Sequence, residues 1–267
     1  MDADRYTHGH HESVLRSHRW RTAENSAGYL LAHLSPGMSL LDVGCGPGNI
    51  TGDLASRLGD GVVVGIDVSE EIIDVAHREA LVDERANLRF EVGDVYQLGF
   101  ADESFDVVHA HQVLQHLGRP VAALGEMRRV LRPGGILAVR DADYGAFVWA
   151  PTDPVLDRWM ELYHQITRRN GADADAGRHL KRWVRDAGFE DGVTTSANWT
   201  YETAAQRAWW GGLWAERVRE SEFARQGVEY ELTTRSELDD ISGAFERWAD
   251  APDGIFIVVN VEVLARR

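Results

Sequence analysis

The sequence LLDVGCGPGNIT, residues 40–51, runs from an apolar strand directly into a helix. Three glycines, Gly44, Gly46 and Gly48, allow the backbone to turn sharply there and allow a ligand to approach the main chain at the helix N-terminus. Their spacing is G-x-G-x-G, whereas dinucleotide-binding loops read G-x-G-x-x-G, and Asn49 occupies the position of the third glycine. The loop therefore lacks a glycine that a bound pyrophosphate would require.

Acidic residues stand at the ends of the first three predicted strands. Asp42 adds a negative charge beside the glycine loop, which disfavours a diphosphate and favours a ligand with an ammonium or sulfonium group. Asp67 lies 19 residues after Gly48, close to the spacing of about 20 at which a carboxylate meets ribose hydroxyls. Asp94 follows the third strand, where it can accept a hydrogen bond from an adenine amino group. A single such aspartate is more often a cap or turn residue, but three together indicate a nucleoside-bearing ligand.

Apolar β-branched runs alternate with helical patterns through the first half of the chain, which predicts a parallel sheet made of βαβ units. Strands are expected at 39–43, 62–66, 88–92, 105–110 and 136–140. Helices are expected at 50–58, 70–83 and 121–131, the last of them closed by the turn sequence RPGG at 132–135.

The two flanks read differently. Residues 1–34 are polar and histidine-rich and end in a predicted helix at 23–34, which Pro36 and Gly37 stop. Residues 151–250 are mostly helical and contain seven of the nine tryptophans. Tryptophans fill the core of most domains, but so many in one insertion also suggest a cavity wall.

Two further strands are predicted near the C-terminus. A weaker one lies at 192–200, and a last apolar one lies at 255–264 after a turn at 252–254. Together they can form the antiparallel edge that doubly wound sheets often carry. The sequence GADADAG, residues 171–177, is predicted to be a loop between helices.

The composition narrows the partners that the chain can have. Its 267 residues include 28 Lys+Arg and 43 Asp+Glu, a formal net charge of -15, with a pI near 5.1. Such an anionic chain is expected to repel nucleic acids and acidic membrane surfaces. Cys45 is the single cysteine, so no internal disulfide can form, and residues 1–21 contain no apolar run typical of a signal peptide. We expect a cytoplasmic protein with a small-molecule partner, no nucleic acid and no membrane.

Five motifs follow one another along the chain: LLDVGCGPGN, GIDVS, GDVYQL, FDVVHAHQVLQHL and RRVLRPGG. As a set they resemble the motifs of class I S-adenosylmethionine-dependent methyltransferases, with the closest likeness to the ubiquinone/menaquinone-biosynthesis-like branch. The resemblance covers residues 38–140 and fades in both flanks. It implies a doubly wound, Rossmann-like α/β sheet of seven strands whose last strand is antiparallel, with S-adenosyl-L-methionine as the cofactor.

The resemblance also implies which residues bind the cofactor. The methionine moiety would be held by the loop and the strand before it: Asp42, Gly44, Cys45, Gly46 and Gly48. Asp67 would hold the ribose, and Asp94 with the backbone of Val95 the adenine, with Val68, Gly93 and His111 beside them.

The N-terminal residues have three possible roles: a terminus without function, a lid over the cofactor, or a metal site. In the first, the terminus is frayed, or its side chains merely pack on the sheet. In similar methyltransferases an N-terminal helix closes over the cofactor, so Tyr6 would lie against the sulfonium and Arg21 would pair with the methionine carboxylate. A metal site at His8, His10 and His11 is a third option, although no carboxylate or cysteine set accompanies them.

Four residues are candidates for the chemistry. Methyl transfer from a sulfonium requires alignment and exclusion of water, and a base only where the acceptor loses a proton. His111 and His116 lie at the carboxyl end of the fourth strand, where open α/β sheets place reactive groups, and His109 is a weaker candidate on the same side of the strand. Asp141 and Tyr144 begin the insertion at the mouth of the expected site and could deprotonate or orient an acceptor.

Metal-dependent chemistry is not expected. Some related methyltransferases bind a metal through an E-x-x-E-H arrangement, but this chain has Gln112, Gln115 and His116 at those positions, and glutamine is a poor ligand for a divalent cation. Arsenic methyltransferases require several cysteines, and Cys45 alone cannot repeat that chemistry.

The sequence therefore predicts a methyltransferase that acts on a small molecule. We expect an N-terminal lid at 1–37, a cofactor-binding core at 38–150, a mainly helical cap at 151–250 and a final strand of the core sheet at 251–267, in a chain that could form a homodimer. Two alternatives stay open. One is a protein that binds S-adenosylmethionine for another reaction or for regulation, and the other is a dinucleotide oxidoreductase, which the missing glycine and Asp42 disfavour.

Overall fold

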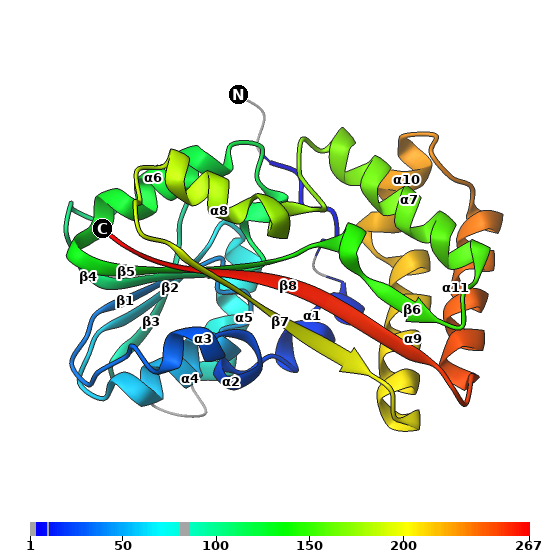
Figure 1. Cartoon of the computed structure of the whole chain (residues 1–267), viewed down its shortest axis with the longest axis horizontal. Helices are drawn as coiled ribbons and strands as arrows, with labels where there is room; N and C mark the ends of the chain where they lie inside the picture. The colour runs from blue at the N-terminus through cyan, green and yellow to red at the C-terminus, as the bar shows by residue number, and fades with distance from the viewer. Residues whose placement is uncertain (1–3, 10, 81–85) are drawn as a thin grey trace.

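The computed structural model describes residues 4–9, 11–80 and 86–267, and within them one mixed sheet spans the molecule (Figure 1). The strand order is β3-β2-β1-β4-β5-β8-β6, with β7 also paired to β8. Strands β1 to β5 are parallel, and β6, β7 and β5 each run antiparallel to β8. The strands are β1 Leu40–Val43, β2 Val63–Asp67, β3 Leu88–Val92, β4 Phe105–His111, β5 Leu131–Ala142, β6 Val148–Ala150, β7 Val193–Tyr201 and β8 Ile255–Arg266.

The long strand β8 organises the edge of the sheet. Its residues 260–266 pair with β5 and its residues 255–257 pair with β6, while residues 256–264 pair with β7. Because β7 overlaps the residues used by both other strands, β7 must lie on one edge of β8, and β5 and β6 must share the other. The short β6 therefore continues the line of β5. The expected doubly wound sheet with an antiparallel last strand is confirmed, and within the described residues it has eight strands where seven were expected.

The two faces of the sheet are covered by different helices. Leu40, Val63 and Val107 belong to one apolar cluster, whereas Leu41 and Val64 point to the opposite face and belong to another, as strand alternation requires. Figure 1 shows α6 and α8 over one face and α2, α3 and α4 over the other. The bounds of these helices and of α5 are α2 Ala23–Ser26, α3 Gly28–Leu31, α4 Asn49–Leu58, α5 Glu70–Ala80, α6 Pro120–Val130 and α8 Ala176–Asp186.

A third apolar cluster lies beyond the carboxyl ends of the parallel strands. It is built from helices α7 Pro154–Arg169, α9 Ala204–Glu220, α10 Glu222–Glu229 and α11 Arg235–Asp250, which pack at the far end of β6, β7 and β8 (Figure 1). Trp159 and Trp214 are fully buried there and pack edge to face, with ring centroids 4.6 Å apart. The expected mostly helical segment and its tryptophan core are thus confirmed.

Two local expectations are wrong, and one strand was missed. The helix expected at 23–34 is two short helices, because Ala27 leaves the helical region (φ −131°, ψ 19°) after the capping box that Thr22 and Asn25 form. The RPGG turn lies inside β5, since Gly134 and Gly135 exchange backbone hydrogen bonds with Arg267 at the end of the chain. Strand β6 was not expected. The end of the helix predicted at 70–83 falls outside the described residues.

The conformation of Gly48 generates a test of the loop. Its φ of +86° and a neighbouring ring would make a Cβ atom both strained and only 2.5 Å from Cζ of Phe90. Gly48→Ala should lower the free energy of unfolding by about 2–4 kcal/mol, from left-handed strain and overpacking together.

Gly37→Ala is the matched control, because Gly37 has the same φ of +86° with nothing within 4 Å of the position that a Cβ atom would take. It should cost only the strain, about 1–2 kcal/mol. Urea unfolding measures both variants, and equal losses would contradict the argument that Phe90 fills the space beside Gly48.

Candidate cofactor and acceptor site

The glycine loop is held by the ends of two strands. Gly44, Gly46 and Gly48 all have positive φ, of +68°, +56° and +86°. The backbone N–H of Gly46 donates to Oδ2 of Asp67 over 3.2 Å, and the N–H of Cys45 donates to the carbonyl of Ile66 over 2.9 Å. The main chain between β1 and α4 is therefore fixed against β2, where it leaves room for a ligand.

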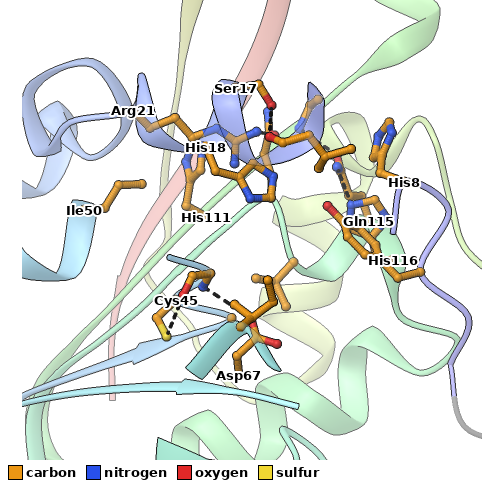
Figure 2. Close-up of a pocket in the computed structure, with 18 of the residues that line it drawn as sticks. His8, Ser17, His18, Arg21, Cys45, Ile50, Asp67, His111, Gln115 and His116 are labelled. Carbon is orange, nitrogen blue, oxygen red and sulfur yellow. Dashed lines mark hydrogen bonds between the residues drawn. The ribbon is translucent and has the colours of Figure 1, made fainter. Parts of the chain in front are cut away.

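One cavity of about 710 Å³ lies over this loop. Its walls come from three parts of the chain: the loop and strand ends, the N-terminal segment, and the cap. Figure 2 shows the labelled side chains around a common hollow, with Cys45 and Asp67 on one side, His18, Arg21 and His111 opposite them, and His8, Gln115 and His116 on a third side.

The cavity brings most of the sequence-predicted site residues together. Those that line it are Tyr6, Arg21, Asp42, Gly44, Cys45, Gly46, Asp67, Val68, Gly93, Asp94, Val95, His111, His116 and Tyr144. Gly48 and Asp141 are not among its lining residues. Gly48 faces Phe90, and Asp141 lies behind the wall.

Asp42 is a buried anchor beneath the loop. Its Oδ2 accepts a 2.5 Å hydrogen bond from the hydroxyl of Thr51 on α4, and its Oδ1 lies 2.7 Å from Nδ1 of His109 on β4. Both carboxylate oxygens are therefore engaged within the protein. His109 is fully buried in this contact and does not line the cavity, which agrees with its lower rank among the candidates.

Asp67 and Asp94 each combine a turn contact with a place on the cavity wall. Oδ1 of Asp67 accepts the N–H of Ser69 over 3.1 Å, and Oδ1 of Asp94 accepts the N–H of Tyr96 over 2.8 Å. These bonds fix both carboxylates at the carboxyl ends of adjacent parallel strands. The plain interpretation as turn residues and the interpretation as ligand contacts are compatible.

His111 faces the cavity with both ring nitrogens buried and without a hydrogen-bond partner among the described residues. Burial, followed by the charges of Arg21 and Arg140, holds the pKa of His111 well below its usual range. His111 is therefore neutral at physiological pH and offers one lone pair to a bound molecule.

His116 is neutral in a defined tautomer. Oε1 of Gln115 accepts the N–H of Ala142, so its Nε2 is the atom that donates to Nε2 of His116, over 3.0 Å. The proton of His116 must then be on Nδ1, which makes that atom a hydrogen-bond donor. Burial, and then Arg21, lower the pKa of His116 to about 3.

Asp141 supports the wall from behind. It is fully buried, and its Oδ1 accepts the N–H of Gln115 over 3.1 Å in the short 3-10 helix η1 Leu114–His116. Burial raises the pKa of Asp141 to about 8, against the effect of the N–H groups of Gln115 and Leu114. Its position suits the orientation of η1 rather than contact with a bound molecule.

The N-terminal segment completes the cavity, and sequence reasoning missed much of what it supplies. Nε2 of His8 lies 2.9 Å from the hydroxyl of Tyr163 and 3.3 Å from that of Tyr144. The ring of Tyr6 packs edge to face on His116 with centroids 4.7 Å apart. Helix α1, Glu12–Arg19, carries His18 onto the wall. The sequence signal available for these residues was the spacing of two between Tyr6 and His8, which places both side chains on one side of an extended segment. That spacing could not predict which distant residues they contact.

Arg21 is a partly buried cation, and no ion pair joins it to an acidic residue in the described part of the chain. Its Nη2 donates to Oε1 of Gln112 over 2.7 Å, and its Nε has no hydrogen-bond partner among the described residues. Burial lowers the pKa of Arg21 to about 10, so the guanidinium stays charged at neutral pH. A charge of this kind, with a buried Nε, favours an anionic ligand group, and the carboxylate of an amino acid fits it.

Two observations on the described residues concern metal ions and membranes. No group of three or more His, Cys, Asp or Glu among them is arranged to hold a metal ion, and His10 lies outside them. No helix in the described part of the chain is both long and apolar enough to cross a bilayer.

The fold and the site define a Rossmann-like protein that binds an adenosyl amino acid. Gly46 leaves an open approach, since the nearest atom to its absent Cβ is Nδ1 of His18 at 3.6 Å. The Nε–H of Arg21, which has no hydrogen-bond partner among the described residues, can donate to a carboxylate. Asp67 lies at the strand end where nucleotide-binding βαβ units place the carboxylate that contacts ribose hydroxyls. The residues present therefore fit S-adenosylmethionine.

Comparison with known proteins gives the family. A family model described as a methyltransferase domain matches residues 34–199. A methyltransferase of Schizosaccharomyces pombe is 31% identical over 98% of this chain and 96% of its own length. A demethylmenaquinone methyltransferase of Lactococcus lactis is 34% identical over 57% of this chain and 66% of its own length. The chain belongs to the S-adenosylmethionine-dependent methyltransferase family, as its motifs predicted.

The solved structures agree on the fold. Phosphoethanolamine N-methyltransferase 2 of Haemonchus contortus, solved with phosphomonomethylethanolamine and S-adenosylhomocysteine, superposes with a TM-score of 0.55. The identity is 18%, over 88% of this chain and 49% of that one, so this likeness concerns the fold alone.

The raised pKa of Asp141 predicts a pH-dependent stability difference. Because its folded pKa of about 8 exceeds the usual value of 3.8, the folded state holds a proton that the unfolded state loses, and this stabilising contribution disappears as the pH rises from about 4 to about 8. Asp141→Asn keeps the acceptor oxygen and carries no charge. Its melting temperature should exceed that of the wild type at about pH 9, and by a much smaller margin near pH 5.

Thermal unfolding at the two pH values measures this difference. Asp60→Asn, at an exposed position, is the control and should leave both melting temperatures unchanged. A variant of Asp141 that destabilised the protein more at high pH than at low pH would overturn the assignment.

Proposed function

We propose that this chain transfers the methyl group of S-adenosylmethionine to a small organic molecule bound between the glycine loop and the cap. The observation that carries the proposal is the shared cavity, because its wall joins the glycine loop and Asp67 to Tyr144 and the aromatic residues of β7 and α9. Its volume of about 710 Å³ suits a cofactor together with a small acceptor rather than a polymer.

The cofactor orientation follows from the charges around the cavity. Asp67 accepts hydrogen bonds from the ribose hydroxyls, and Asp94 with the backbone of Val95 binds the adenine. Val68, Gly93 and Cys45 line the same part of the cavity. Arg21 receives the methionine carboxylate. Tyr6, in contact with His116, then lies beside the sulfonium.

The N-terminal segment acts as a lid in this proposal, and residues 151–250 act as the cap. Support comes from the packing of α1 against α9 and from the contacts of Tyr6 and His8 with side chains far along the chain. Closure of these parts excludes water from the reacting atoms and holds the acceptor in line with the methyl group.

When bound, S-adenosylmethionine supplies a methyl group already activated by a positive sulfur. His111 is the residue best suited to accept the proton that a hydroxyl acceptor loses, since its ring nitrogens have no hydrogen-bond partner among the described residues. A neutral histidine of low pKa suffices, because that proton becomes strongly acidic as the new bond to carbon forms. His116 and Tyr144 orient the acceptor, and Asp141 holds η1 in place.

Other expectations stay predictions. The cytoplasmic location and the absence of a nucleic-acid partner are predictions from the composition, and the homodimer is a prediction as well. Binding of the cofactor without transfer to any acceptor would favour the alternative use of S-adenosylmethionine.

Loss of Asp67 tests the cofactor site. Asp67→Ala should weaken binding of S-adenosylhomocysteine by about 10- to 100-fold, because two ribose hydroxyls lose a charged acceptor and the N–H of Gly46 loses its partner. Isothermal titration calorimetry measures the affinity, and Asp60→Ala, at an exposed position, should bind as the wild type does. Unchanged affinity in Asp67→Ala would refute the proposed orientation.

Loss of His111 tests the proton acceptor. His111→Ala should lower kcat by about 100-fold or more for a hydroxyl acceptor, while binding of S-adenosylhomocysteine changes by no more than about threefold. His116→Ala should instead raise KM more than it lowers kcat. Transfer of a labelled methyl group to a panel of small phenols, alcohols and amines provides the assay, and an unaltered kcat in His111→Ala would exclude this residue as the base.

A further inference from the structure

The cap supplies a second cation, which is buried and which the proposed cofactor orientation leaves unused. Arg217, on α9, lines the cavity and is 5% exposed. Its Nη2 donates to the carbonyl of Ser13 over 3.0 Å and to the hydroxyl of Ser17 over 2.9 Å, both on α1. Its Nε has no hydrogen-bond partner, and no ion pair joins Arg217 to a carboxylate within the described ranges.

The groups around Arg217 do not neutralise it. Besides burial, the strongest influences on its pKa are the hydroxyls of four tyrosines, Tyr144, Tyr6, Tyr163 and Tyr201. Of the described lining residues that follow Ala142 in the chain, Arg217 is the one with a charged side chain. Asp67 and Asp94 lie at the carboxyl ends of β2 and β3, in the part of the wall proposed to bind the cofactor. The carboxylate of Asp4 is engaged by the hydroxyl of Tyr96 and the N–H of Gly118.

The same part of the wall is rich in hydrogen-bond donors. Nε1 of Trp210, Nε1 of Trp214 and the hydroxyl of Tyr201 are buried and have no hydrogen-bond partner among the described residues. Trp210, Trp214 and Arg217 follow one another at helical spacing on one face of α9. A wall that offers several unmatched donors and one charge is complementary to an acceptor group with negative charge.

The aromatic rings alone could instead suggest a site for a cation. The guanidinium of Arg217 already lies over the ring of Trp214, with Cζ 4.8 Å from the centroid, so it occupies the position that a ligand cation would take. A second positive charge there would be repelled by Arg217, whose side chain is itself buried and therefore weakly screened by solvent. The rings therefore suit the flat or apolar body of the ligand.

We propose that Arg217 and the neighbouring indoles form a subsite for an anionic oxygen group on the methyl acceptor, which is then an aromatic or apolar acid. This inference rests on the proposed function and names its substrate class. Ser17 lies on the same side of the hollow as His18 and Arg21 (Figure 2), so α1 holds the guanidinium in place as it covers the cavity. The lid and the recognition of the acceptor are thereby linked.

The test compares ligands of matched shape. 4-Hydroxybenzoate and phenyl phosphate are the anionic probes, 4-hydroxybenzamide is the neutral probe, and benzyltrimethylammonium is the cationic one. Calorimetry with the full chain, with and without S-adenosylhomocysteine, should show at least one anion binding about tenfold or more tightly than the amide, with the cation weakest. The two anions distinguish a carboxylate from a phosphate.

Variants connect that preference to Arg217. Arg217→Met should abolish the preference for the anion and keep the affinity for S-adenosylhomocysteine within about threefold. Arg217→Lys should retain part of the preference, and Ser17→Ala, which removes a hydrogen bond but not the charge, should retain most of it. Thermal unfolding of each variant checks that it is folded.

The outcomes separate two failures. If the wild type does not bind S-adenosylhomocysteine, the proposed function is wrong. Four results would overturn the acid subsite. In the wild type they are equal binding of anion and amide, tighter binding of the cation, and no measurable anion binding at millimolar concentration. In Arg217→Met the contrary result is an anion preference that survives. Loss of S-adenosylhomocysteine binding in Arg217→Met alone would assign Arg217 to the cofactor instead.

Discussion

The bend between β1 and α4 is the constraint on which the site depends. Three glycines with positive φ turn the chain there, and the space that side chains would need is filled by Val113 beside Gly44 and by Phe90 beside Gly48. Asp42 and Asp67 hold the bend from two strands. Since the backbone itself forms the floor of the cavity, a ligand can lie directly on the main chain at the start of a helix.

The cavity divides its charges between two walls. Asp42, Asp67 and Asp94 belong to the sheet, where the ends of parallel strands converge, whereas Arg21 belongs to the N-terminal segment and the buried Arg217 to the cap. Two further charged lining residues, Asp4 and Arg119, both contact Tyr96. An adenosyl amino acid presents hydroxyls and an amino group on one side and a carboxylate on the other, so this division orients it. The neutral histidines between the walls can accept or donate protons without adding a charge near the reacting atoms.

Much of the sheet and of the cofactor wall could be predicted from the sequence. Strand bounds agree within about two residues for the first four strands, because apolar alternation and the glycine punctuation are local signals. The positions of His8 and Arg217 could not be predicted, since each depends on contacts across most of the chain, with Tyr163 for His8 and with Ser13 for Arg217. Asp141 shows the limit of strand-end reasoning, because it lies at the correct edge but behind the wall.

The most direct test of the account is a crystal structure of the chain with S-adenosylhomocysteine. The account predicts the ribose against Asp67, the adenine between Asp94 and the backbone of Val95, and the sulfur directed toward the part of the cavity that His111 and the cap enclose. A cofactor bound elsewhere, or one whose sulfur faced solvent with the cap side closed off by protein, would contradict it.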